Sequence, residues 1–237
     1  MYIYGKNVAK EKINSNKQIG KIYLAEKFND QEILGLIKEK GLKYTLVPNK
    51  FLDNKIQGLH QGIVIECPDI TLFDFNYIKS IKNDRPILVM LDHLEDPHNF
   101  GAIIRTCEAL GIDGIIIPKD RSVGVNSTVV KTSAGAIYNM PIISVVNLLD
   151  TINKLKGLGY WIIGSDMNGE NYTKIDYNMP ICLIVGNEGH GISNIIKKNV
   201  DFMASIPMIG TINSLNASVS CGIILSQIVF GENNVGK

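Results

Sequence analysis

Arginine is the residue type whose placement in this chain most suggests chemistry. Only three of the 24 basic residues are Arg, namely Arg85, Arg105 and Arg121. An Arg side chain offers a planar, permanently charged fork of donors, which the compact ammonium of Lys lacks. Arg105 is expected inside a helix, where the small side chains of Ala102 and Ala109 leave room for a phosphate or carboxylate. Pairing with Glu108 or another acidic residue is the structural alternative, and the scarcity of Arg favours the functional interpretation.

The segment 91–111, LDHLEDPHNFGAIIRTCEALG, sets the start of that helix. Asp96 followed by Pro97 predicts the helix N-terminus, because Asp caps exposed N–H groups and Pro adopts a helical φ at the first position. Gly111 predicts its end. Asn99 therefore falls in the first turn, beside the end of the preceding strand.

A second segment, IVGNEGHGIS at 184–193, is rich in glycine. Closely spaced glycines allow positive φ and let backbone groups approach a ligand. The spacing G-x-x-G-x-G is neither the dinucleotide fingerprint nor a phosphate loop, which argues against an NAD or ATP site. Glu188 in this turn has three roles open to it: a base, an orienting acceptor, or a cap for the following helix.

A third segment, 205–230, contains a loop and then a long helix that we expect to begin near Ser214. Asn216, Ser218 and Ser220 crowd the junction between the two. The later positions are apolar around most of the helix, so more than one neighbour must cover it. An internal core helix and a homodimer interface are equally good interpretations at this point.

Several classes of protein are excluded by the pattern of residues. No H-E-x-x-H or Cys/His cluster links the four His, so we expect no metal, and no G-x-S-x-G elbow indicates a serine hydrolase. The four Cys are widely spaced with no C-x-x-C pair, which argues against disulfides. No apolar run is long enough for a membrane span, and the first residues lack a secretion signal, so we expect a cytoplasmic protein.

The elements that must position these loops form an α/β pattern. Apolar strands are predicted at 87–91, 114–118, 141–146, 160–165, 181–186 and 202–207. Near-continuous Ile, Val and Leu runs predict strands covered on both faces of a parallel sheet, with helices between them. Ligands of such sheets bind beyond the carboxyl ends of the strands, which is where the three segments fall.

The first part of the chain reads as a smaller α/β unit with a different charge. A helix is expected near 7–13 and strands at 20–25, 43–47 and 62–66, with Asp30 capping a helix at 31–40. Residues 1–60 carry 11 Lys against six acidic residues, whereas the remainder is net acidic. A polyanionic partner or a solvated surface explains this excess. We predict domains at 1–70 and 86–237, joined by a linker at 71–85.

Taken together, three motifs resemble those of the SpoU family. The motifs are DPHNFGAIIRT (96–106), IVGNEGHGI (184–192) and IPMxGxxNSLNASVS (206–220), and their order and spacing both fit. SpoU proteins are RNA ribose 2′-O-methyltransferases of the trefoil-knotted SPOUT superfamily. Within the family, the stretch 117–136 looks most like the enzyme that methylates a guanosine ribose of large-subunit (23S) ribosomal RNA.

The resemblance implies a knotted parallel-sheet methyltransferase domain, preceded by a small α/β RNA-binding domain. It also implies S-adenosylmethionine as the cofactor, ribosomal RNA or another structured RNA as the partner, and a homodimer whose active sites draw on both subunits. Arg105 would be the central catalytic residue, orienting and polarising the ribose hydroxyl, with its role as proton acceptor left open. The other catalytic positions would be Asn99, Glu188 and Asn216. Cofactor contacts would come from Gly186, Asn187, Ile206, Met208, Leu215 and Ser218.

Two alternatives to this function remain. One is a non-catalytic RNA-binding or ribosome-assembly module, although the presence of Arg105, Asn99, Glu188 and Asn216 argues against a decayed site. The other is a methyltransferase of the same family that acts on transfer RNA.

Overall fold

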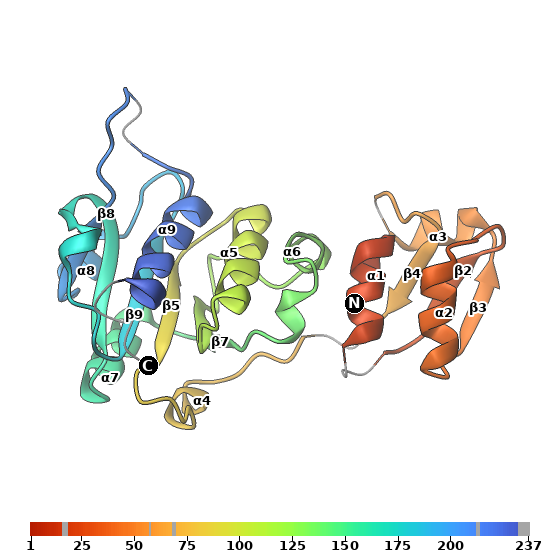
Figure 1. Ribbon diagram of the computed structural model, residues 1–237, viewed down its shortest axis with the longest axis horizontal. Coiled ribbons are helices and arrows are strands. Elements are labelled where there is room, and N and C mark those ends of the chain that lie inside the picture. The colour runs from red at the N-terminus through yellow and green to blue at the C-terminus, as the bar shows by residue number, and fades with distance from the viewer. Residues whose placement is uncertain (16–18, 57, 68–69, 212–213, 232–237) are drawn as a thin grey trace.

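The computed structural model describes residues 1–15, 19–56, 58–67, 70–211 and 214–231, and it forms two lobes, each built on its own sheet (Figure 1). The smaller lobe contains strands β1 (Tyr2–Tyr4), β2 (Ile22–Ala25), β3 (Tyr44–Val47) and β4 (Ile63–Glu66), with helices α1 (Lys6–Asn14), α2 (Gln31–Glu39) and α3 (Asn49–Lys55). Its sheet order is β1-β4-β2-β3, and only the β2–β3 pair is parallel.

Local sequence explains most of this lobe. The Asp30 side chain accepts a hydrogen bond from the Ile33 N–H at 3.2 Å and caps α2, as predicted. Ile33 and Ile37 are the buried residues of α2, and they lie one turn apart on one face of the helix. Strand β1 was not predicted, because three residues are too few to show an alternating pattern.

The larger lobe carries six strands, and every pairing between them is parallel, in the order β10-β8-β9-β5-β6-β7. The strands are β5 (Ile87–Asp92), β6 (Gly114–Pro118), β7 (Ile142–Val145), β8 (Trp161–Asn171), β9 (Ile181–Gly186) and β10 (Phe202–Ser205). The helices are α4 (Asn76–Lys79), α5 (Pro97–Ala109), α6 (Ser127–Thr132), α7 (Leu148–Gly157), α8 (Asn194–Lys197) and α9 (Ala217–Phe230), with 3₁₀ turns η1 (Ala136–Tyr138) and η2 (Tyr172–Lys174).

Both faces of this sheet are buried, which explains the near-continuous apolar strands. Val89 and Leu91 face a core that includes residues of α5, α6 and α9. Leu88 and Met90 face the opposite core, with residues of α4, α7 and α8. The predicted class, an α/β protein with a parallel sheet, is therefore confirmed. The trefoil knot remains a prediction from the resemblance.

The two lobes meet where α1 and β1 of the smaller lobe face α6 and η1 of the larger one (Figure 1). The Lys12 ammonium lies 4.0 Å from the centroid of the Tyr138 ring. A Cβ added to Gly135 would stand 2.6 Å from the Cβ of Glu11, so the two chain segments are in close contact. Lys12 is 2 % exposed, so its side chain is buried at this junction.

Residues 71–85, predicted as a linker, run along the larger lobe. The Phe73 N–H donates to the Ile142 carbonyl at 2.8 Å, and the Ser144 N–H donates to the Phe73 carbonyl at 2.9 Å. Ile78 of α4 is buried against the core beneath the sheet. The domain boundaries themselves stay a prediction. None of the helices in the described part of the chain combines the length and hydropathy that a bilayer crossing requires.

Candidate active site

A cavity of about 430 Å³ lies at one edge of the larger sheet. It is lined by residues 165–168 of β8, residues 185–191 at and after the end of β9, and Lys197 of α8. Ile206 and Met208 after β10, and residues 214–217 with Ser220 at the start of α9, complete the lining. Two of the three predicted loops therefore meet here. Residues 212–213 of the third motif lie outside the described residues.

The glycine-rich loop forms one wall of the cavity because its backbone folds tightly on itself. The Asn187 N–H donates to the Gly191 carbonyl at 3.1 Å, and the Gly191 N–H donates back to the Asn187 carbonyl at 2.8 Å. A Cβ added to Gly186 would lie 2.1 Å from the carbonyl carbon of Gly191, and Gly191 has a φ of 65°. Glycine is required at position 186 for steric reasons, and at position 191 the left-handed φ favours it.

A chain of side-chain hydrogen bonds joins the three motifs. The Asn99 Nδ2 donates to Glu188 Oε1 at 2.9 Å, and the Asn216 Nδ2 donates to Asn99 Oδ1 at 2.9 Å. Asn99 is 7 % exposed, so its amide is held in one orientation at the start of α5. Three of the four predicted catalytic residues are thus brought together, from segments 117 residues apart at the widest.

Asn216 has a second function as the cap of α9. Its Oδ1 accepts hydrogen bonds from the Ser218 N–H at 2.9 Å and the Ser218 Oγ at 2.6 Å. This cap starts the helix at Ala217, later than the predicted start near Ser214. The same side chain therefore fixes both the helix start and the orientation of Asn99.

Arg105 takes no part in this series of side-chain hydrogen bonds. It is exposed on α5 and does not line the cavity. Its guanidinium makes no hydrogen bond or ion pair with any other residue in the described ranges, so the alternative pairing with Glu108 does not occur there. The Glu108 carboxylate instead accepts from Asn139 Nδ2 at 3.5 Å.

The predicted cofactor residues divide between two surfaces. Gly186, Asn187, Ile206, Met208 and Leu215 line the cavity. Ser218 does not, and it lies instead on a neighbouring groove between α5 and α9.

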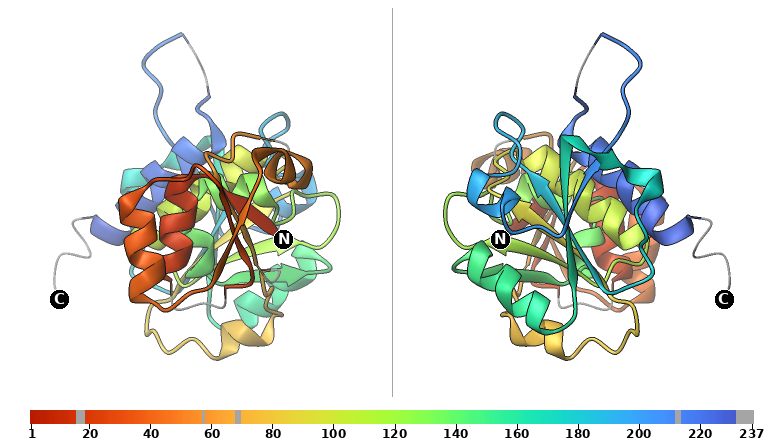
Figure 2. Two further views of the ribbon diagram at one scale, coloured as in Figure 1. Left: turned by 90° about the vertical axis from the view of Figure 1, so that its right-hand side faces the viewer. Right: turned by 90° about the vertical axis from the view of Figure 1, so that its left-hand side faces the viewer.

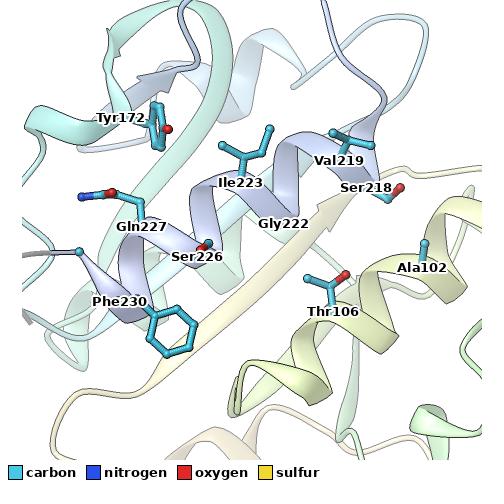
Figure 3. Close-up of a pocket in the computed structure, with 11 residues that line it drawn as sticks. Ala102, Thr106, Tyr172, Ser218, Val219, Gly222, Ile223, Ser226, Gln227 and Phe230 are labelled. Carbon is cyan, nitrogen blue, oxygen red and sulfur yellow. The ribbon is translucent and has the colours of Figure 1, made fainter. Parts of the chain in front are cut away.

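Figure 3 shows this groove, with Ala102 and Thr106 on α5 facing Ser218, Gly222 and Ser226 on α9. Also on α9, Val219 in the first turn and Phe230 at the end are 49 % and 64 % exposed. The opposite side of the helix is packed into the core through Cys221, Ile224, Leu225 and Ile228. The groove side of α9 therefore combines apolar side chains with Ser218, Ser226 and Gln227, and within the described residues it is only partly covered.

Sequence reasoning missed a charged pair in the cavity wall. The Lys197 ammonium lies 2.5 Å from Asp166 Oδ2, and both residues line the cavity. Burial opposes the charge on Asp166, but hydrogen bonds from Lys197 and from Asn168 outweigh it and lower the pKa of that carboxyl. Asp166 lies in the middle of β8, and the only sequence sign was a polar run after the apolar part of the strand.

A second missed residue is Asp92, which is 2 % exposed at the end of β5. Its Oδ2 accepts from the Ser193 N–H at 2.7 Å, and its Oδ1 lies 2.6 Å from His93 Nδ1. The Asn187 Nδ2 donates to the His93 carbonyl at 2.9 Å. Asp92 thereby anchors the glycine-rich loop to the end of β5. Among the described residues, no three His, Cys, Asp or Glu side chains gather into a metal-binding cluster.

Comparison with known proteins gives matches along almost the whole chain. Residues 86–226 match the SpoU rRNA Methylase family, and residues 2–71 match the model described as RNA 2′-O ribose methyltransferase substrate binding. The Bacillus subtilis (strain 168) protein YacO, whose name places it in the TrmH family of tRNA/rRNA methyltransferases, is 39% identical over 243 residues, covering 100% of this chain and 98% of its own.

Solved structures with the same fold include the SpoU methyltransferase AviRb from Streptomyces viridochromogenes, in complex with the cofactor AdoMet. It has a TM-score of 0.80 at 22% identity and covers 97% of this chain and 89% of its own. The A. aeolicus TrmH/SpoU tRNA modifying enzyme has a TM-score of 0.58 at 30% identity, over 65% of this chain and 79% of its own.

Proposed function

Because the chain belongs to the SpoU rRNA Methylase family, we propose that it methylates a ribose 2′-hydroxyl in RNA with S-adenosylmethionine as the donor. The coarser statement, that it is an RNA methyltransferase of the TrmH/SpoU family, follows from the membership itself. The observation that best supports methylation of a ribose 2′-hydroxyl is the series of hydrogen bonds Glu188–Asn99–Asn216, which joins all three motifs at the cavity.

The cavity suits the proposed cofactor in size and chemistry. About 430 Å³ lies within the range of small-molecule sites. Val185, Ile206 and Leu215 supply apolar contacts for a purine ring, and the backbone of the glycine-rich loop supplies N–H and C=O groups. When bound, the sulfonium supplies an electrophilic methyl group, so the chain's own residues need only orient the acceptor and manage its proton.

Arg105 supplies the orienting charge in this proposal. A ribose hydroxyl is a weak nucleophile, so alignment with the methyl group and assisted proton loss carry the acceleration. A guanidinium is permanently protonated, and its fork is suited to hold a phosphate beside the reacting ribose while polarising the hydroxyl. Glu188, held by Asn99, is the nearby carboxylate available to orient or accept a proton.

We further propose that two copies of the chain pair through α9 and α5. Among the described residues the groove of Figure 3 exposes Val219 and Phe230, and it is lined in part by Ala102 and Thr106 of α5, the helix that also carries Arg105. Since Arg105 lies outside its own chain's cavity, a second copy on this groove is the simplest way to bring an Arg105 to each site. The interface would be isologous, as in most homodimers.

For the substrate, we propose a guanosine of 23S ribosomal RNA, on which the enzyme would act in the cytoplasm. The support is the stretch 117–136, whose sequence looks most like the enzyme for that nucleotide. Transfer RNA is the second candidate, because the names of the curated relatives include both RNA classes.

A direct experiment separates these outcomes. Purified chain is incubated with radiolabelled S-adenosylmethionine and either 23S rRNA or total tRNA from cells that lack the gene. The methylated position is then mapped by its resistance to alkaline cleavage. Label in a 23S guanosine ribose is the expected result. Label in tRNA alone would overturn the proposal that 23S rRNA is the substrate. Label in a base would overturn the proposal that a ribose 2′-hydroxyl is methylated.

A further inference from the structure

We propose that a second cavity, on the smaller lobe, takes an unpaired nucleotide of the substrate RNA. This proposal rests on the RNA methyltransferase function above and names the place where that RNA is held. The cavity has a volume of about 350 Å³, and we call it the lobe cavity. The residues that carry the argument are Lys6, Lys27, Phe28, Asn29, Asn49 and Leu59.

The lobe cavity occupies the edge of the small sheet at which ligands of parallel strands bind. Its walls come from the segment after β2, from the starts of α1 and α3, and from the loop before β4. Strands β2 and β3 are parallel, and their carboxyl ends open towards it. The left view in Figure 2 shows the small lobe end-on, with α1 and α2 on one side of its sheet and α3 on the other.

The cavity holds one fixed cation and one available cation. The Lys6 ammonium lies 3.0 Å from Asp30 Oδ2. That contact, together with the hydrogen bond from the Ile33 N–H, lowers the pKa of Asp30 and keeps its carboxylate charged. Lys27 is exposed and forms no ion pair within the described ranges. Lys27 is therefore the group that can meet a phosphate.

The far wall is ordered by its own hydrogen bonds. The Gly62 N–H donates to His60 Nδ1 at 2.9 Å, so the proton of a neutral ring is on Nε2, which lies 3.0 Å from Asp53 Oδ1. The carboxylate of Asp53 is thereby occupied by the ring. The Lys6 N–H donates to Gln61 Oε1 at 2.9 Å, which ties the start of α1 to the same loop. The wall presents a fixed shape to a ligand.

Two amide side chains are free to recognise a base. Asn29 and Asn49 are exposed, and neither side chain makes a hydrogen bond to another of the described residues. Leu59, which is 73 % exposed, and Phe28 also line the cavity. Amide groups that can pair with a base edge, apolar side chains that can contact its face, and a lysine for its phosphate match a single unpaired nucleotide.

Two further observations favour RNA over a small-molecule ligand. The first 60 residues carry 11 of the 24 basic residues, and all of those 11 are Lys. Residues 2–71 match a model described as RNA 2′-O ribose methyltransferase substrate binding, and the lobe cavity lies wholly inside that range. An RNA loop or bulge presents such a base, whereas the bases of a duplex are stacked and paired.

The test uses the full chain and a 23S rRNA transcript, with poly(U) as the non-specific RNA. Affinities are measured across a salt series for Lys27→Ala and for the double variant Asn29→Ala/Asn49→Ala. Matched controls are Lys38→Ala, at the far end of α2, and Asn54→Ala, on α3 but outside the cavity lining. Calorimetry with S-adenosylmethionine checks that each variant retains a folded larger lobe.

Lys27→Ala should weaken binding to both RNAs and reduce the slope of log affinity against log salt by about 0.7. The double variant should weaken binding to the transcript about tenfold or more, with little effect on poly(U) and no change in slope. The controls should bind as the unmodified chain does. Cross-linking of a 4-thiouridine transcript should label peptides that contain residues 25–30 or 58–62.

The two proposals fail in different ways. Cavity variants that bind and cross-link like the controls, while methyl transfer to RNA proceeds, would overturn the lobe cavity alone. Cavity-dependent RNA binding by a chain that transfers no methyl group would overturn the proposed function and leave the RNA site in place. Binding of free guanosine monophosphate that is lost in the double variant, with RNA affinity unchanged, would reassign the cavity to a small nucleotide.

Discussion

At the scale of residues, the site has a fixed part and an accessible part. Glu188, Asn99 and Asn216 are tied to one another, so their polar atoms have defined directions before any ligand arrives. Arg105 is exposed and unpaired within the described ranges, so it can reorganise around a phosphate. Preorganised polar groups reduce the cost of reaching the transition state, and an exposed charge serves recognition.

Arg105→Lys tests the accessible part. Because α5 is exposed at this position, the variant should fold and elute as the unmodified protein does. A point charge cannot reproduce the guanidinium fork, so methyl transfer should fall roughly 100-fold or more. The measurement is the rate of label transfer to RNA, with circular dichroism as the folding control. Transfer at the unmodified rate would remove Arg105 from the mechanism.

Asn216 tests the fixed part, because substitutions can separate its two functions. Asn216→Ala should lower the free energy of unfolding by about 1 kcal/mol through loss of the α9 cap. Asn216→Asp keeps the oxygen that caps α9 but loses the N–H donor to Asn99. The Asp variant should therefore be more stable than the Ala variant, yet it should still transfer the methyl group slowly. Urea unfolding and transfer rates measure the two effects. An Asp variant with full activity would show that the link to Asn99 is dispensable.

At the scale of elements, strand β8 both pairs with its neighbours in the sheet and forms part of the cavity wall. Its partner β10 aligns first with residues 163–164 and then with 170–171, so the residues between them leave the ladder. Residues 165–168 of this bulge form a wall of the cavity. Bulges commonly re-aim side chains next to active sites. Here the bulge directs Asp166 towards Lys197 on α8.

The Asp166–Lys197 pair predicts a pH dependence of stability. A carboxyl whose pKa is lowered in the folded chain stabilises it above the unfolded pKa of about 3.9, and that contribution is lost as the pH falls through the folded value. Asp166→Asn should therefore be less stable at pH 7, by about 1 kcal/mol or less, and the difference should shrink as the pH falls below about 3.9, the pKa of an unfolded Asp. Melting temperatures from pH 3 to 7 measure it. A difference that grows on acidification would contradict the assignment.

At the scale of the whole molecule, the two lobes carry different surface features. The smaller lobe carries the basic excess and the lobe cavity, and the larger lobe carries the cofactor-sized cavity and the uncovered groove. The contact between the Lys12 ammonium and the Tyr138 ring is one of those that join the two lobes.

Val219→Glu tests the proposed pairing of two chains through the groove. A charge buried in an apolar interface costs several kcal/mol, so the dimer should weaken roughly 100-fold or more. Val146→Glu is the matched control, because Val146 is 83 % exposed after β7 and is not part of the groove. Sedimentation velocity over a concentration series measures both. A Val219→Glu chain that sediments as the unmodified chain does would overturn the interface.

The sequence by itself determined the parallel α/β class, the cap of α5 at Asp96 and the family, because these depend on local periodicity, local hydrogen bonds and contiguous motifs. It also singled out Asn99, Glu188 and Asn216, but only the folded chain shows that they form one hydrogen-bonded series. Asp92, Asp166 and the lobe cavity were beyond sequence reasoning. Their partners lie far along the chain, so their roles exist only once the sheets bring distant segments together.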